Sequence, residues 1–502
     1  MNKLAGWFLK YRYLILGLIV LVGIGMQINS SLRSGDFWEH SSVIRELATH
    51  PLHPQNPQLM VAAPSAFFTP YHLVLALISR LIRESAVDIL LRAGIFNLAL
   101  FLLGLYLFIS VIEPRHPVGA SFYSLLLVLF LWGAGVWNYS GFFHLRGLAR
   151  ISPYPSVFAL GLSLVALWMD AQRLDKKREI WLIPIFFITV IVLLTHPITF
   201  FFLAAGLAAF SLRTAGKLWM ELVKLAGLLG LSFALAALWP YYPFLKLLLG
   251  SSTVYHDSNQ VMYQFVLLRI WPLLIGVPLL AIEIYRAPRS PLPWMFLMLL
   301  GLYLLGGITG NYSYGRVISY VAIILQITIA IFLERMEERL TKAAQYSNVW
   351  QVGFSLVFTF LLVTISFEPF IRPLLTSYNS EGTVQWDKYT WLSRYTNQSD
   401  VIMAQLPTSL IVPTISGKVV AFDRPQPFVL DAVQRQEDVL HFFSEKTSQE
   451  ERKQILSKYK VNFILLEKSD IADWEVLRPL IAPFGDLVFR GKRFLLYKVK
   501  IL

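Results

Sequence analysis

Long apolar segments separated by short polar loops are the feature that most constrains the fold of this chain. Eleven segments are apolar enough, alone or as a pair of shorter helices, to cross a hydrocarbon layer about 30 Å thick. They lie near residues 13–30, 88–112, 118–138, 154–170, 180–195, 197–213, 218–239, 264–286, 292–309, 316–334 and 348–368. Because 56% of the 502 residues are hydrophobic and only 15% are charged, a soluble domain could not bury this surface. The sequence predicts a multi-pass α-helical membrane protein with about 11 transmembrane helices.

The net charge of +13 is concentrated in alternate loops between the apolar segments. Basic clusters occur at 173–178, 213–217, 286–289 and 335–342, and the positive-inside rule places such loops in the cytoplasm. We therefore attribute the charge to topology and expect no nucleic-acid partner. The predicted location is the plasma membrane, with the N-terminus cytoplasmic. The absence of cysteine excludes disulfides, thiolate catalysis and cysteine-bound metals.

A twelfth apolar segment at 66–82 would reverse the sidedness of everything after it if it crossed the membrane. The basic loops agree with one another, and working backward from them places this segment outside, so we interpret it as a helix lying on the outer leaflet. The alternative is a true span, with another segment failing to cross. The first external loop then runs over residues 31–87, and residues 41–49 within it have an amphipathic helical pattern.

The apolar segments end near residue 370, and the chain after it has the pattern of a soluble domain. Strands are predicted at 401–406, 418–422 and 461–466, a helix at 449–458, and a closing hairpin at 486–499. We therefore divide the chain into a transmembrane domain, 1–370, and a small α/β domain, 371–502. The odd number of spans places the second domain outside the cytoplasm.

A short acidic cluster, Gly35-Asp36-Phe37-Trp38-Glu39-His40, follows the first span. A carboxylate held near the membrane surface can act as a general base, and Asp36 and Glu39 would share one face of a helix. Two close carboxylates tend to separate in pKa. The structural alternative is that Asp36 begins a helix and Glu39 completes a capping box.

Other unusual polar residues also fall on the predicted outer side, where an external cavity would collect them. His196 interrupts an apolar segment and is either a ligand contact or a satisfied histidine between two helices. Arg316 suits a lipid phosphate because a guanidinium binds two oxygens at once, whereas the alternative is contact with lipid headgroups. The candidate substrate-binding residues are Trp38, His40, Arg146, Arg150, Tyr154, His196, His256, Asp257, Tyr314 and Arg316.

The chain lacks a Walker A loop, a dinucleotide-binding glycine pattern, a Gly-x-Ser-x-Gly elbow, a His-Glu-x-x-His motif and an Asp-x-Asp motif. Its arrangement of a first span, a long external loop opening on an acidic residue and many further spans resembles the GT-C class of integral membrane glycosyltransferases. The segments Tyr154-Pro155-Ser156 and Thr195-His196-Pro197 look like those of bacterial members, which favours a prokaryotic source. The chain departs from the mannosyltransferase and aminoarabinose transferase pattern because its second acid stands three residues after the first.

The resemblance implies an inverting hexosyl- or pentosyltransferase. The donor would be a polyprenyl-phosphate-linked sugar, and the acceptor a glycan, lipid or protein at the extracytoplasmic face, among membrane lipids. Asp36 or Glu39 would be the base. No definite cofactor is implied, and a divalent cation stays an open alternative. Two other hypotheses are a flippase for a lipid-linked sugar, which would need ionisable groups along a path through the spans, and a non-catalytic scaffold.

Overall fold

The computed structural model describes residues 2–28, 35–214, 217–254, 259–341, 347–372, 386–468 and 474–500. The chain divides into two compact units, and both are assembled from separate stretches of sequence. Unit 1 comprises Met1–Ser31, Leu91–Trp239 and Tyr255–Glu381, whereas unit 2 comprises Leu32–Leu90, Pro240–Val254 and Gly382–Leu502.

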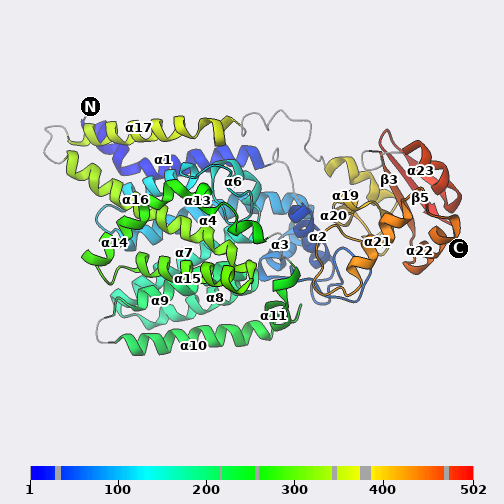
Figure 1. Cartoon of the computed structure of the whole chain (residues 1–502), viewed down its shortest axis with the longest axis horizontal. Coiled ribbons are helices and arrows are strands. Elements are labelled where there is room, and N and C mark those ends of the chain that lie inside the picture. Colours follow the sequence, from blue (N-terminus) through cyan, green and yellow to red (C-terminus); the bar gives the residue numbers. More distant parts are fainter. Residues whose placement is uncertain are drawn as a thin grey trace. The chain divides into compact units, whose positions relative to one another are not determined.

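Unit 1 is a bundle of helices packed side by side (Figure 1). Its α-helices are α1 (Asn2–Ile28), α4 (Ala86–Ile112, whose first turn belongs to unit 2), α5 (Pro117–Phe130), α6 (Leu145–Ile151), α7 (Pro155–Lys176), α8 (Leu182–Thr195), α9 (Pro197–Ser211), α10 (Leu218–Ala237), α13 (Val266–Ile270), α14 (Gly276–Arg286), α15 (Pro291–Thr309), α16 (Ile318–Thr341) and α17 (Ser347–Ile365). Short 3-10 segments η1 (Glu179–Trp181), η2 (Val261–Tyr263), η3 (Trp271–Ile275) and η4 (Tyr312–Val317), and a π-helical turn at Phe367–Ile371, connect or extend them.

Eight helices in the described part of the chain are long and apolar enough to cross a membrane. The other three predicted spans are shorter apolar helices: Pro117–Phe130, Glu179–Thr195 and Pro197–Ser211. The segment predicted to lie on the outer leaflet is also a short apolar helix, α3 (Pro70–Ile82). The chain is therefore a multi-pass membrane protein, as the apolar pattern predicts.

Proline sets the start of several helices. It stands in the first turn of α3, α5, α7, α9 and α15, where its fixed φ suits a helix and its missing N–H has no intrahelical partner to lose. The predicted break at 195–197 follows from this: α8 ends at Thr195, and Pro197 begins α9.

Unit 2 holds the first loop together with the C-terminal residues. Its helices are α2 (Gly35–Thr49), α3, α11 (Phe244–Val254), α19 (Leu406–Ser409), α20 (Val412–Ile415), α21 (Ala432–Phe442), α22 (Gln449–Lys458) and α23 (Trp474–Ile481), with 3-10 segments η6 (Trp386–Arg394) and η7 (Ala482–Phe484). The strands are β1 (Val401–Ala404), β2 (Lys418–Val419), β3 (Phe463–Glu467), β4 (Gly485–Arg490) and β5 (Phe494–Val499).

The sheet has the order β2-β1-β3-β5-β4. The first three strands are parallel, and β5 and β4 form the predicted antiparallel hairpin. Helices α21, α22 and α23 pack on the sheet around a core that includes Met403, Phe442, Ile464, Ile481 and Tyr497. The predicted α/β patterning of the C-terminal residues is confirmed.

The first loop adds to the free edge of this sheet. Leu59 forms a parallel bridge with Val419 of β2, and the Val419 N–H donates to the carbonyl oxygen of Gln58 at 2.8 Å. Residues 32–90 are thus in the same compact unit as the C-terminal strands, although a cut of the sequence at residue 370 would separate them.

Candidate active site

The acidic cluster forms the first turns of α2 in unit 2. Asp36 lies in the first turn, and Glu39 follows three residues later on the same side of the helix. The Asp36 side chain is 39% exposed, whereas that of Glu39 is only 4% exposed. One acid is therefore open to a ligand and the other is enclosed.

Arg424, from the loop after β2, is placed beside both acids. Its Nη2 contacts Oδ1 of Asp36, and its Nε lies 3.8 Å from Oε2 of Glu39. Gln426, two residues later, donates from Nε2 to Oε1 of Glu39 at 3.5 Å. Gly35 permits this close approach, since a Cβ there would lie 3.1 Å from Cδ of Arg424. A single loop thus supplies a cation to Asp36 and an amide to Glu39.

Burial distinguishes the two acids chemically. It raises the pKa of Glu39 to about 8, against a smaller lowering by the hydrogen bond from Gln426. Glu39 is therefore mostly protonated near neutral pH, whereas Asp36 is partly exposed and contacts a guanidinium. Burial thus makes Glu39 the less able of the two carboxyl groups to accept a proton at that pH.

The other two candidates of the cluster are buried behind the acids. Trp38 is enclosed, and its backbone carbonyl accepts a 3.0 Å hydrogen bond from Oγ1 of Thr414. The ring nitrogens of His40 and His72 are 2.9 Å apart, and the other His72 nitrogen lies 2.8 Å from Oγ1 of Thr69. Burial lowers the pKa of His40 to about 3, so it is neutral. These side chains tie α2 to α3 and α20.

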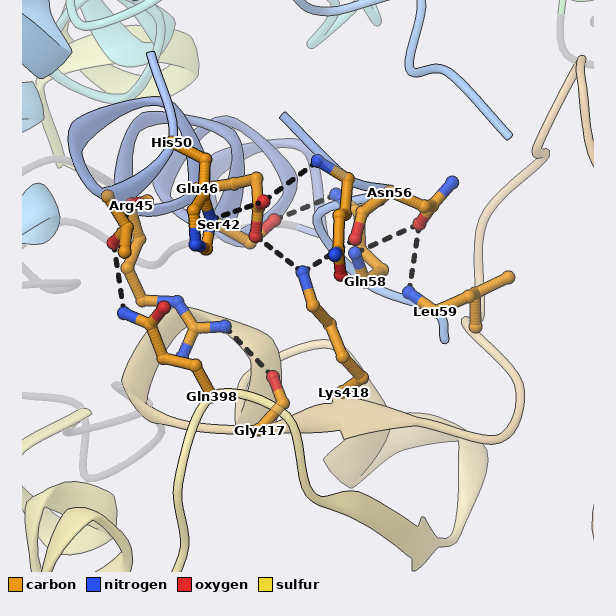
Figure 2. Close-up of polar contacts among 12 residues, drawn as sticks. Ser42, Arg45, Glu46, His50, Asn56, Gln58, Leu59, Gln398, Gly417 and Lys418 are labelled. Carbon is orange, nitrogen blue, oxygen red and sulfur yellow. Dashed lines mark hydrogen bonds and ion pairs between the residues drawn. The ribbon is translucent and has the colours of Figure 1, made fainter. Parts of the chain in front are cut away.

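A buried polar cluster joins the far end of α2 to the sheet (Figure 2). Lys418 of β2 donates from Nζ to Oε2 of Glu46 and to the carbonyl oxygen of Asn56, each at 2.6 Å. Arg45 donates to the carbonyl oxygen of Gly417 at 2.9 Å. Burial alone would raise the pKa of Glu46, but the Lys418 ammonium holds it below its usual value. Burial lowers the pKa of Lys418 to about 8.

In unit 1, Arg316 and Tyr314 lie on η4. The Nε of Arg316 donates to Oδ1 of Asn259 at 2.9 Å, and its guanidinium lies 5.9 Å from the ring centroid of Tyr139. Tyr314 packs edge-on against Phe201 of α9, with ring centroids 5.7 Å apart. The guanidinium is thus oriented by a buried amide while staying partly exposed.

His196 caps α9, the helix that Tyr314 packs against. Its Nδ1 accepts from the backbone N–H of Thr199 at 3.3 Å and lies 2.7 Å from the Thr199 hydroxyl. That hydroxyl is 2.6 Å from the hydroxyl of Tyr320. His196 therefore has hydrogen-bond partners within the protein, as expected for a satisfied histidine between two helices. Tyr154 occupies the equivalent position before Pro155 of α7 and is buried.

The remaining candidates are less constrained or lie outside the described residues. Arg146 and Arg150 are on α6, where Arg146 is exposed and Arg150 donates to the carbonyl oxygen of Asn138. His256 and Asp257 lie outside the residues that the structure describes.

The structure thus places the candidates in two groups. Asp36, Trp38, Glu39 and His40 share α2 in unit 2, whereas the candidates from α6, α7, α9 and η4 belong to unit 1. Sequence reasoning missed Arg424, Gln426 and Asn259. The only signal for the first two was a polar turn made rigid by two prolines, Asp423-Arg424-Pro425-Gln426-Pro427.

A divalent cation does not fit the acid pair as arranged. Among the described residues, no group of three or more His, Asp or Glu side chains is placed to hold a metal ion. The Arg424 guanidinium also lies beside both carboxyl groups, and burial keeps Glu39 mostly protonated near neutral pH. At this pair, the positive charge comes from Arg424.

No protein-family model and no curated protein matches the sequence significantly. Solved structures do match. The oligosaccharyltransferase of Archaeoglobus fulgidus in the apo form aligns with a TM-score of 0.56 at 12% identity, over 95% of this chain and 73% of that one. The same protein tethered to an acceptor peptide aligns with a TM-score of 0.57 at 14% identity, over 99% of this chain and 75% of that one. ArnT from Cupriavidus metallidurans bound to undecaprenyl phosphate aligns with a TM-score of 0.53 at 12% identity, over 97% of this chain and 98% of that one.

All three are GT-C class membrane glycosyltransferases. The chain has the GT-C fold. The likeness extends over 95–99% of the chain and is therefore not confined to the helical bundle.

Proposed function

We propose that the chain is a membrane glycosyltransferase that moves a sugar from a polyprenyl-phosphate carrier to a glycan, lipid or protein acceptor at the extracytoplasmic membrane face. The observation that carries the proposal is the arrangement of Asp36, Glu39 and Arg424 on a GT-C fold. The bound ligands named for two similar structures, an acceptor peptide and undecaprenyl phosphate, support this choice of substrates.

Asp36 is the base in this proposal. Its carboxylate takes the proton of the acceptor as the acceptor atom forms a bond to the anomeric carbon of the sugar. The bond from that carbon to the phosphate oxygen breaks, and the polyprenyl phosphate leaves with the electron pair. Direct displacement of this kind inverts the configuration at the anomeric carbon. Glu39 is less suited to the role near neutral pH, because burial raises its pKa to about 8.

We assign one arginine to the proposed base and another to the leaving phosphate. Arg424 contacts and orients Asp36 without a metal ion, so we derive no step through one. Arg316, oriented by Asn259, is our choice for the leaving phosphate, with Arg146 or Arg150 as a second cation. A lipid phosphate is already a good leaving group, so in this proposal the positive charge of arginine side chains is sufficient to stabilise it as it departs.

The test begins with glycan analysis of a deletion strain, because the missing sugar identifies the donor. Membranes carrying Asp36→Asn are then compared with wild type in a transfer assay with that donor. Asp486→Asn is the matched control, since Asp486 is an exposed aspartate of unit 2 that also pairs with a single cation, Lys500. We expect the first variant to lose transfer and the control to keep it. Full transfer by a folded Asp36→Asn protein would remove Asp36 from the role of base.

A further inference from the structure

A cavity lies within the helical bundle, at the end that carries the basic loops. It has a volume of about 160 Å³ and lies mainly between α14 and α16, which pack side by side (Figure 1). The positive-inside rule predicts that this end is cytoplasmic. We therefore expect the cavity at the cytoplasmic surface, whereas the proposed reaction takes place at the extracytoplasmic surface.

One arginine in this cavity is held in a fixed position. Arg335 donates from Nε to Oε2 of the buried Glu113 at 2.8 Å, and its Nη2 lies 2.6 Å from the same oxygen. Its Nη1 lies 3.3 Å from Oε2 of Glu283. The two carboxylates orient the guanidinium and offset most of its charge.

Two further arginines line the same cavity. Arg286 is in the last turn of α14, and Arg339 follows Arg335 by one turn of α16. Among the described residues, neither Arg286 nor Arg339 has an ion-pair partner. An anion between Arg286 and Arg339 would offset their charge and accept hydrogen bonds from both guanidinium groups.

The other half of the cavity wall is apolar. Leu279 and Ile282 of α14 and Ile331 and Phe332 of α16 form part of it. Ile282 is 44% exposed and Phe332 is 45% exposed, on a surface suited to hydrocarbon rather than water. A ligand that fills the cavity must therefore join an anionic group to an apolar chain.

We propose that this cavity binds the headgroup of an anionic glycerophospholipid, with its phosphate between Arg286 and Arg339 and its acyl chain along Ile282 and Phe332. Basic pockets between transmembrane helices at the cytoplasmic surface bind such headgroups, and anionic lipids are abundant in that leaflet. Free phosphate would use only the polar half of the cavity. The site is independent of the proposed transferase reaction.

Native mass spectrometry of the full-length protein tests the proposal. The protein is equilibrated in mixed micelles that contain equal amounts of phosphatidylglycerol and phosphatidylcholine, and the bound lipids are counted. We expect wild type to retain phosphatidylglycerol at least about fivefold over phosphatidylcholine, and Arg286→Gln/Arg339→Gln to lose most of this preference. The matched control is Arg178→Gln/Arg289→Gln, which removes the same charge from the same predicted surface without touching the cavity.

Any of four results would overturn the site. The first two are that the cavity variant keeps the wild-type lipid preference, or that the control variant loses this preference equally. The other two are that millimolar inorganic phosphate displaces the lipid, or that the protein retains undecaprenyl phosphate in preference to phosphatidylglycerol. A charge-conserving variant, Arg286→Lys/Arg339→Lys, guards against misfolding and is expected to keep part of the preference. The measurement needs no sugar donor, so its outcome is separate from that of the transfer assay.

Discussion

Lys418 donates a 2.6 Å hydrogen bond to Glu46, and both side chains are at most 3% exposed. This buried ion pair joins α2 to the edge of the C-terminal sheet. Removing one partner leaves the other charge buried and uncompensated, which typically costs about 3–5 kcal/mol.

We therefore expect Glu46→Gln to lower the unfolding midpoint of unit 2 strongly, measured as protection of the α2 peptide against proteolysis on heating. The double variant Glu46→Leu/Lys418→Met is expected to be less damaging, because neither charge remains. Equal stability of Glu46→Gln and wild type would contradict this assignment.

The two acids of α2 are expected to respond differently to loss of charge. Asp36→Asn should reduce transfer by about 10²–10⁴-fold, the usual range for loss of a general base. Glu39→Gln should stay within a fewfold of wild type near neutral pH, because Gln imitates the protonated acid that burial already favours. The measurement is the initial rate of transfer by each variant in membranes. The reverse order of effects would assign the base to Glu39.

The raised pKa of Glu39 also predicts how stability depends on pH. The ordinary pKa of 4.5 applies to the unfolded chain and about 8 to the folded one, so the folded state binds more protons between these values. Stability should therefore fall as pH rises through this window, by at most about 1.4 kcal/mol per pH unit, and level off above pH 8.

Glu39 lies beside Arg424 and Gln426, and the hydrogen bond from Gln426 opposes the effect. Thermal unfolding from pH 5 to 9 should show a shallower decline in Glu39→Gln than in wild type. Parallel curves for the two proteins would mean that Glu39 is already ionised.

Arg424 should matter through Asp36. Arg424→Met is expected to lower transfer by about 10–100-fold, equivalent to about 1.4–2.7 kcal/mol of barrier, with partial rescue by Arg424→Lys. Wild-type transfer should be unchanged by a chelator, because the cation at the acid pair belongs to the chain. Arg490→Met, which removes an exposed guanidinium from the same unit, is the control. Loss of wild-type transfer on chelation would show that a metal ion is needed.

His196 is expected to act as a helix cap. His196→Ala should destabilise the protein by about 1 kcal/mol, and His196→Asn should recover most of this because its amide oxygen can accept the same hydrogen bond from Thr199. Thermal unfolding checks stability and the transfer assay checks function. If His196→Asn is stable but as inactive as His196→Ala, the histidine contacts substrate.

Local pattern was enough to predict much of this protein. The apolar segments indicated the helical bundle, Pro197 indicated the break between α8 and α9, and the segment around Gly491 indicated the final hairpin. The three-residue spacing of Asp36 and Glu39 placed them on one helix face. Each of these features depends on residues that are close together in the sequence, within a few helical turns or a single hairpin.

Long-range contacts could not be predicted in the same way. Nothing near Arg424 in the sequence indicates that it pairs with an acid of the first loop, because that contact depends on how β2 and α2 pack. The raised pKa of Glu39 was equally hidden, since it follows from the burial of that side chain in the folded protein. The grouping of residues 32–90 with the C-terminal strands has the same cause.

This grouping has a consequence for synthesis. A growing chain delivers α2 from the ribosome long before β1, β2 and the loop that carries Arg424. Until those residues are made, the carboxylates of α2 have no guanidinium beside them, and Glu46 has no ammonium. Contacts of such wide sequence separation form slowly. We therefore expect the contacts of Arg424 with Asp36 and Glu39 to form late in folding, after the C-terminal strands have been made.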